Sequence, residues 1–71
     1  MIATEIKLAK TIYSKKEIET AISDYSHLCV VGIGENSRYW IVTFFEFTGD
    51  FRILKKEFEN YLIELMNGAQ K

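Results

Sequence analysis

The first segment of the chain alternates between apolar and polar positions. Ile6 and Leu8 fall on one parity, and Glu5 and Lys7 fall on the other. A period of two residues is typical of a β-strand that has one buried face. The pattern therefore predicts a strand over residues 2–9.

Two later segments, residues 15–26 and 51–66, repeat their apolar residues at the three-to-four-residue spacing of an amphipathic helix. The apolar stripe of the first is Ile18, Ala21, Ile22 and Tyr25, and that of the second is Phe51, Leu54, Phe58, Tyr61, Leu62 and Leu65. Each segment is therefore predicted to be a helix that buries one side.

Residues that start and stop helices stand at the ends of these segments. Ser14 and Glu17 have the spacing of a capping box, in which each side chain accepts the backbone N–H of the other residue. Asp50 is a suitable N-cap for the second helix, and Asn67 followed by Gly68 is a suitable C-terminal stop. Local signals thus support the boundaries that the periodicity indicates.

Between the two helices lie two apolar runs joined by a short polar loop. Residues 28–33 and 39–47 are rich in β-branched and aromatic side chains, and residues 34–38 join them. This spacing predicts a β-hairpin. The order of elements along the chain is therefore β-α-β-β-α.

This order predicts an α+β fold with both helices on one face of a three-stranded antiparallel or mixed sheet. A right-handed crossover through the first helix, followed by the hairpin, gives the strand order 1-3-2 of a split β-α-β unit. The arrangement corresponds to a ferredoxin-like fold that lacks its last strand. We expect residues 1–67 to form a single domain and residues 68–71 to be a disordered tail.

The second and third strands are apolar on both parities, although two helices can cover only one face of the sheet. The residues expected to face the helices are Ile41, Thr43, Phe45 and Phe47. The residues expected on the opposite face, where they would form an interface, are Trp40, Val42 and Phe44. A slip of one residue would exchange the two sets. In either case an aromatic patch stays exposed, which favours a symmetric homodimer.

Two further pairs of residues are candidate contacts with a partner. Ile63 and Met66 fall outside the apolar stripe of the second helix, so we expect them to pack against another molecule. Glu5 and Lys7 lie on the first strand, which the absence of a fourth strand leaves as a free edge. An extended peptide can bind such an edge by strand addition.

Size and composition also favour association. A chain of 71 residues buries only about 60% of the surface that its unfolded form exposes. The single cysteine, Cys29, excludes an internal disulfide, and 48% of the residues are hydrophobic. A partner is therefore expected to supply part of the stability.

The charge balance weakens the case for nucleic acid and for membranes. Nine basic and ten acidic residues give a net charge of −1, which creates no strong field toward phosphates or anionic lipids. No apolar run approaches the length of about 18 residues that a membrane span requires. No basic and apolar leader of the secretory kind begins the chain. We expect a cytoplasmic protein.

His27 and Cys29 are the residues most open to a chemical interpretation. On a strand, positions two residues apart point to the same side, as two metal ligands or a nucleophile and its base must. No third ligand or orienting group accompanies them. We therefore expect a buried thiol, and no catalytic, cofactor or metal site.

Two surface groups leave binding alternatives open. One is a set of aromatic residues that could stack single-stranded bases on a sheet: Tyr39, Trp40, Phe44 and Phe45. Only Arg38 and Arg52 flank it with positive charge, so packing explains it better. The other is a basic group near the first turn, which is either a solvated rim or a site for an acidic leader peptide or partner: Lys7, Lys10, Lys15 and Lys16.

Three stretches carry a family resemblance: residues 12–18 (IYSKKEI) followed by Ala21, residues 30–33 (VVGI) and residues 58–63 (FENYLI). Their pattern resembles that of the small HxsD-type proteins of the His-Xaa-Ser peptide system. The resemblance implies an accessory protein, without catalytic residues of its own, encoded beside radical-SAM enzymes that mature a ribosomally made peptide. Glu64 departs from it, because the family pattern has arginine there.

These observations predict a non-enzymatic adaptor that binds a peptide or a partner protein. We expect it to have no cofactor. The binding surface is either the edge of the first strand or the sheet face opposite the helices. The alternatives are a structural homo-oligomeric subunit that binds no peptide and a sheet that binds single-stranded nucleic acid.

Overall fold

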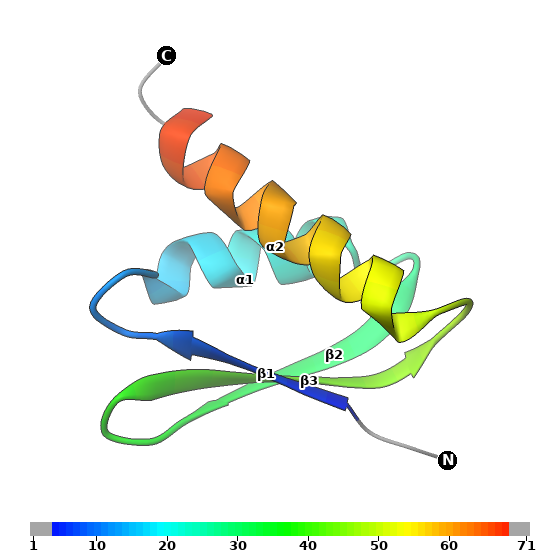
Figure 1. Cartoon of the computed structure of the whole chain (residues 1–71), viewed down its shortest axis with the longest axis horizontal. Helices are drawn as coiled ribbons and strands as arrows, with labels where there is room; N and C mark the ends of the chain where they lie inside the picture. Colours follow the sequence, from blue (N-terminus) through cyan, green and yellow to red (C-terminus); the bar gives the residue numbers. More distant parts are fainter. Residues whose placement is uncertain (1–3, 69–71) are drawn as a thin grey trace.

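The computed structural model describes residues 4–68 and confirms the predicted α+β fold. The three strands form one antiparallel sheet in the order β1-β3-β2, and both helices lie on the same side of it (Figure 1). The elements are β1 (Thr4–Ala9), α1 (Lys15–Asp24), β2 (Cys29–Glu35), β3 (Tyr39–Phe47) and α2 (Phe51–Gly68).

The helix ends differ slightly from the prediction. α1 ends at Asp24, where Tyr25 closes the helix by donating its N–H to the Ala21 carbonyl at 3.0 Å. α2 includes Asn67 and Gly68, two residues more than predicted, and Gly68 does not have the left-handed conformation expected of the stop. Within residues 4–68 the glycine with a positive φ is instead Gly49, at 84°, in the turn between β3 and α2. The rest of the predicted tail, residues 69–71, lies outside the described residues.

Both predicted N-caps are present, and one closes differently from the expectation. The Glu17 N–H donates to Ser14 Oγ at 3.3 Å, but the Glu17 carboxylate accepts the Ser14 hydroxyl rather than its backbone N–H. The Arg52 N–H donates to Asp50 Oδ1 at 2.9 Å. Hydrogen bonds from the Arg52 side chain and backbone lower the pKa of Asp50. Both helices therefore start at a side chain that accepts an otherwise unpaired N–H.

We predict that Ser14→Ala lowers the free energy of unfolding by about 1 kcal/mol, because it removes the acceptor for the Glu17 N–H. Urea denaturation followed by circular dichroism measures the change. The matched control is Ser37→Ala in the β2–β3 loop, where the hydroxyl makes no hydrogen bond within residues 4–68. Equal losses in the two variants would contradict the capping role.

A series of aromatic rings forms the centre of the core. Phe44 of β3 packs edge-on against Phe51 and Phe58 of α2, with ring centroids 5.5 and 5.2 Å apart. Phe58 packs in turn against Tyr25, which follows α1, at 5.4 Å. Edge-to-face pairs of this kind add about 0.5–1.5 kcal/mol each to the burial of the rings. The same cluster thus holds α2 to the sheet and to α1.

The sheet face that meets the helices is the opposite of the expected one. Val42 and Phe44 are fully buried, and the Trp40 indole N–H donates to the Tyr13 carbonyl at 2.9 Å. The pairing with β1 explains this, because Val42 lies opposite Ile6 and paired residues share a face. The predicted interface of Trp40, Val42 and Phe44 is therefore wrong, since their own chain covers these residues.

Phe47 faces the core as expected, although Phe45 does not. The register between β2 and β3 shifts at a β-bulge, where Val31 lies opposite Phe44 and Val30 lies opposite Glu46. Phe45 is the extra residue, and it reverses the alternation of side chains along β3. As a result Phe44 and Phe47, three positions apart, both contribute to the core.

Candidate protein-interaction site

The sheet face away from the helices, here called the outer face, exposes apolar side chains. Val30, Tyr39 and Phe45 are 52%, 38% and 45% exposed, and Ile41 is half-buried between them along β3. The Phe45 ring lies over β2 where Gly32 has no side chain, since a Cβ there would be 3.0 Å from Phe45 Cε2. An apolar patch is therefore present as predicted, but with different residues.

The observed faces of β3 also separate the aromatic residues that were candidates for stacking bases. Tyr39 and Phe45 are exposed on the outer face, whereas Trp40 and Phe44 pack toward the helices. Glu46 is exposed beside Phe45 and adds negative charge. The four rings thus do not form one stacking platform of the kind that single-stranded bases need.

Within residues 4–68, one side of β1 has no neighbouring strand and is an open edge, because β3 is the neighbour on its other side. The Lys10 N–H donates to the Arg38 carbonyl at 2.9 Å, which extends the β1–β3 pairing by one residue. Backbone groups alternate in direction along an antiparallel pair. The even-numbered residues of β1 therefore bond to β3, and the N–H and C=O groups of Glu5 and Lys7 point outward.

The open edge is short. Ala9 is the next outward-facing residue, but its carbonyl accepts the N–H groups of Ile12 and Tyr13 at 3.0 and 2.9 Å. The turn after β1 thus closes the edge at that end. Glu5 and Lys7, the two residues predicted for the edge, are the described positions that keep both backbone groups available, and their side chains are exposed.

The flank of α2 on the β1 side is partly apolar. The Tyr61 hydroxyl donates to Asp24 of α1, and Ile53 lines a hollow with Leu28, the residue before β2. These contacts place the opposite flank of the helix toward β1, the other edge of the sheet. We call it the outer flank of α2, and its residues are Lys55, Glu59, Ile63 and Met66.

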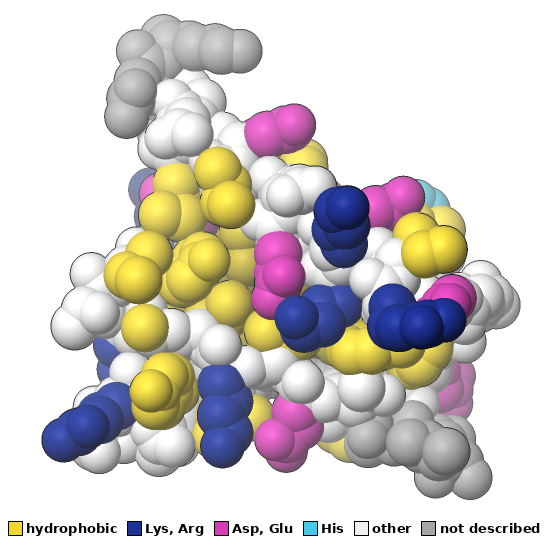
Figure 2. Space-filling model, in the orientation of Figure 1, with side chains coloured by type: hydrophobic (Ala, Val, Ile, Leu, Met, Phe, Trp, Pro, Cys, Tyr) yellow, Lys and Arg dark blue, Asp and Glu magenta, His cyan; other side chains and the backbone are white. Residues whose placement is uncertain are grey.

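Apolar and charged residues share this outer flank. Ile63 is 46% exposed and Met66 is half-buried, while Lys55 and Glu59 form an ion pair of 3.4 Å. Figure 2 has the same orientation as Figure 1, in which the sheet is seen nearly edge-on. It shows apolar side chains gathered beside the C-terminal half of α2. An added strand beside β1 would extend the sheet beneath this flank.

The predicted basic group is divided among separate contacts. Lys10 forms an ion pair with Glu35 at the end of β2 and lies 4.6 Å from the centre of the Trp40 ring. The Lys10 hydrogen bond lowers the pKa of Glu35. Lys15 lies 3.9 Å from Glu19 on its own helix. Sequence reasoning missed the Lys10 contact, which joins the ends of β1 and β2 across β3.

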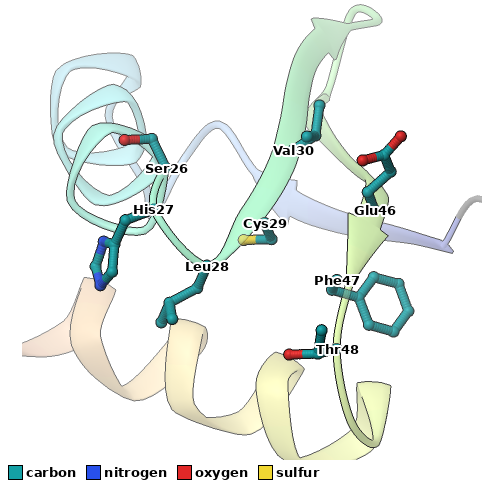
Figure 3. Close-up of a pocket in the computed structure, with 8 residues that line it drawn as sticks. All are labelled: Ser26, His27, Leu28, Cys29, Val30, Glu46, Phe47 and Thr48. Carbon is teal, nitrogen blue, oxygen red and sulfur yellow. The ribbon is translucent and has the colours of Figure 1, made fainter.

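His27 and Cys29 lie in different surroundings. His27 is exposed in the turn before β2, so the alternation of a strand does not apply to it, whereas Cys29 opens β2 and is buried (Figure 3). The thiol donates to the Tyr25 carbonyl at 3.4 Å, and burial raises its pKa. A nucleophilic thiol needs the opposite shift.

The hollow that these residues line is open and of mixed polarity. It has a volume of about 350 Å³ and includes Glu46 and Thr48 opposite His27 (Figure 3). Within residues 4–68, no three side chains of the metal-ligating types come together. Cys29 thus packs on the core at the start of β2, and His27 lies outside the core in the preceding turn.

Comparison with protein families, characterised proteins and solved structures finds no match to this chain. The resemblance to HxsD-type proteins therefore stays a prediction. Neither helix in the described part of the chain is long and apolar enough to cross a membrane.

Proposed function

We propose that the chain is a non-enzymatic adaptor of the cytoplasm that binds an extended segment of another protein along the open edge of β1. The observation that carries the proposal is the outward direction of the backbone groups of Glu5 and Lys7. A strand laid along them gains main-chain hydrogen bonds, each worth about 0.5–1.5 kcal/mol net. Main-chain bonding of this kind supplies affinity in strand addition.

The two faces of the sheet define the chemistry of the bound segment. On the inner face of the bound segment, side chains lie next to Ile6 and Leu8 and beneath Ile63 and Met66. These apolar neighbours favour apolar residues in the segment. Side chains on its outer face lie beside Glu5 and Lys7, so residues of opposite charge are favoured there. The partner segment is therefore an extended stretch in which apolar and charged residues alternate.

The resemblance to HxsD-type proteins supports a more specific form of the proposal. In that form the bound segment belongs to a ribosomally made precursor peptide, and the chain presents it to a radical-SAM enzyme. The adaptor supplies binding and orientation, and the enzyme supplies the chemistry.

A nuclear magnetic resonance titration tests strand addition directly. Short synthetic peptides that alternate valine with lysine or glutamate are added to the dilute labelled protein. We expect the amides of Glu5 and Lys7 to shift and to become protected from hydrogen exchange, because each gains a main-chain partner. Shifts confined to Val30, Ile41 and Phe45 would contradict edge binding.

A proline variant provides the matched control. Lys7→Pro removes an outward N–H and leaves the bonds from β1 to β3 intact, which is where an edge strand tolerates proline. We expect the Kd for the peptide to rise by about tenfold or more, equivalent to at least about 1.4 kcal/mol. Lys7→Ala separates the loss of charge from the loss of the N–H. Equal Kd values for Lys7→Pro and Lys7→Ala would count against main-chain recognition.

A structural subunit that binds no peptide is the second candidate function. The exposed Val30, Tyr39 and Phe45 of the outer face favour it, because side chains of this size pack well against another protein. In the same titration this function predicts no change at Glu5 or Lys7 with any peptide. If the chain is such a subunit, Phe45→Lys is expected to prevent its assembly into the complex and to leave its fold intact.

A further inference from the structure

We infer that, when no partner segment is bound, the open edge of β1 pairs with β1 of a second copy of this chain. The result is a two-fold symmetric dimer in which one antiparallel sheet runs through both molecules. The inference goes beyond the proposed function, but it uses the same edge and therefore regulates access to it.

The charges on β1 select one register for this pairing. The outward-facing residues are odd-numbered, so a two-fold axis can lie at Glu5, at Ile6 or at Lys7. An axis at Glu5 places two carboxylates opposite each other, and an axis at Lys7 places two ammonium groups opposite each other. Like charges directly opposite destabilise a sheet.

An axis at Ile6 avoids both conflicts. It places Glu5 opposite Lys7 of the second copy, and Lys7 opposite Glu5 of the second copy. Each such pair exchanges both N–H and C=O bonds, so every outward backbone group of the two residues is paired. The axis at Lys7 would instead bring Glu5 opposite Ala9, whose carbonyl already accepts two N–H groups. Charge and hydrogen bonding thus favour the same register.

The outer flank of α2 fits the same arrangement. When the second copy continues the sheet beyond β1, the two-fold axis brings the outer flanks of both α2 helices toward each other. Ile63 and Met66 then gain apolar contacts in addition to those that residues 4–68 of their own chain provide. The ion pair of Lys55 and Glu59 places both signs of charge on the flank, so two identical flanks can meet without net repulsion.

Dimerisation on this edge competes with the partner segment. One side of β1 can accept one strand, so a bound peptide replaces the second copy. The apparent affinity for the peptide is therefore expected to fall as the protein concentration rises. The dimer protects an edge that would otherwise be prone to non-specific pairing.

Charge-reversal variants test the register. Molar mass is measured by light scattering after size exclusion, over a wide range of protein concentration. We expect the wild type to be a dimer at high concentration, and Glu5→Lys and Lys7→Glu each to be monomeric, because each places like charges opposite each other. An equimolar mixture of the two variants restores both opposite-charge pairs, so its mass is expected to double.

Two controls complete this test. The double variant Glu5→Lys with Lys7→Glu keeps the opposite-charge pairs and is expected to dimerise like the wild type. Lys16→Glu, an equal charge change at an exposed position of α1, is expected to leave the dimer unchanged. A wild type that is monomeric at every concentration overturns the inference, as do single variants that dimerise or a mixture that stays monomeric.

The outcomes for dimer and peptide are distinguishable. A monomeric wild type that still binds peptide through Glu5 and Lys7 removes the dimer and leaves the proposed function standing. A dimer with the expected charge dependence that binds none of the peptides removes the proposed function and leaves the dimer.

Discussion

Phe44→Ala is expected to unfold most of the protein at room temperature. Phe44 is fully buried and packs edge-on against Phe51 and Phe58. Truncating such a residue costs about 3–5 kcal/mol. A core of this size supplies little more than about 3–5 kcal/mol in total. Urea denaturation followed by near-ultraviolet circular dichroism is therefore expected to show no cooperative transition for this variant.

The neighbouring residue is the matched control. Phe45→Ala makes the same chemical change one position further along β3, on the outer face, where the ring rests over Gly32. We expect it to lower the free energy of unfolding by about 1 kcal/mol or less, because much of the ring is already in water. If Phe45→Ala proved the more damaging of the two, the faces of β3 would be the reverse of those described.

The element order was predictable because each signal for it is local. The alternation around Ile6 and Leu8, the Ser14 cap and the stripe through Phe58 each depend on residues a few positions apart. The strand order followed from the same information, because a crossover and a hairpin leave few topologies for three strands. The structure confirms these predictions.

The face of β3 was not predictable from alternation, because both parities of that strand are apolar. Two non-local features decide it. One is the pairing of Val42 with Ile6, which assigns Val42 to the buried side of β1. The other is the bulge at Phe45, which places Phe47 on the side of Phe44. Neither the register to β1 nor the position of a bulge leaves a signal within residues 39–47.

Some residues of the candidate site could be predicted from the sequence, and others could not. Glu5 and Lys7 were accessible to sequence reasoning because a free edge is a property of topology and their parity is unambiguous. Trp40 was assigned to the wrong face. Its true face follows from its pairing with Leu8 of β1, which is a contact between distant residues. The contact of Lys10 with Glu35 joins residues far apart in sequence at the ends of two strands, and only the assembled sheet brings them together.

A charge at position 62 of α2 is expected to be as damaging as the loss of the Phe44 ring. Leu62 is fully buried between the helices and the sheet, and within residues 4–68 the core around it is made of apolar side chains. Leu62→Asp either buries a carboxylate without a partner or opens the core to water, and each costs several kcal/mol. We expect loss of near-ultraviolet circular dichroism and broad, poorly dispersed amide resonances.

Ile63→Asp, one position further along the same helix, separates stability from association. Ile63 is on the outer flank of α2 and about half exposed, so the aspartate stays hydrated and the fold is retained. Its effect is expected in the molar mass, because the two-fold arrangement would bring the aspartates of both copies together. A folded variant that dimerises as strongly as the wild type would show that the outer flank of α2 takes no part in the interface. A variant that unfolds like Leu62→Asp would show that Ile63 belongs to the core.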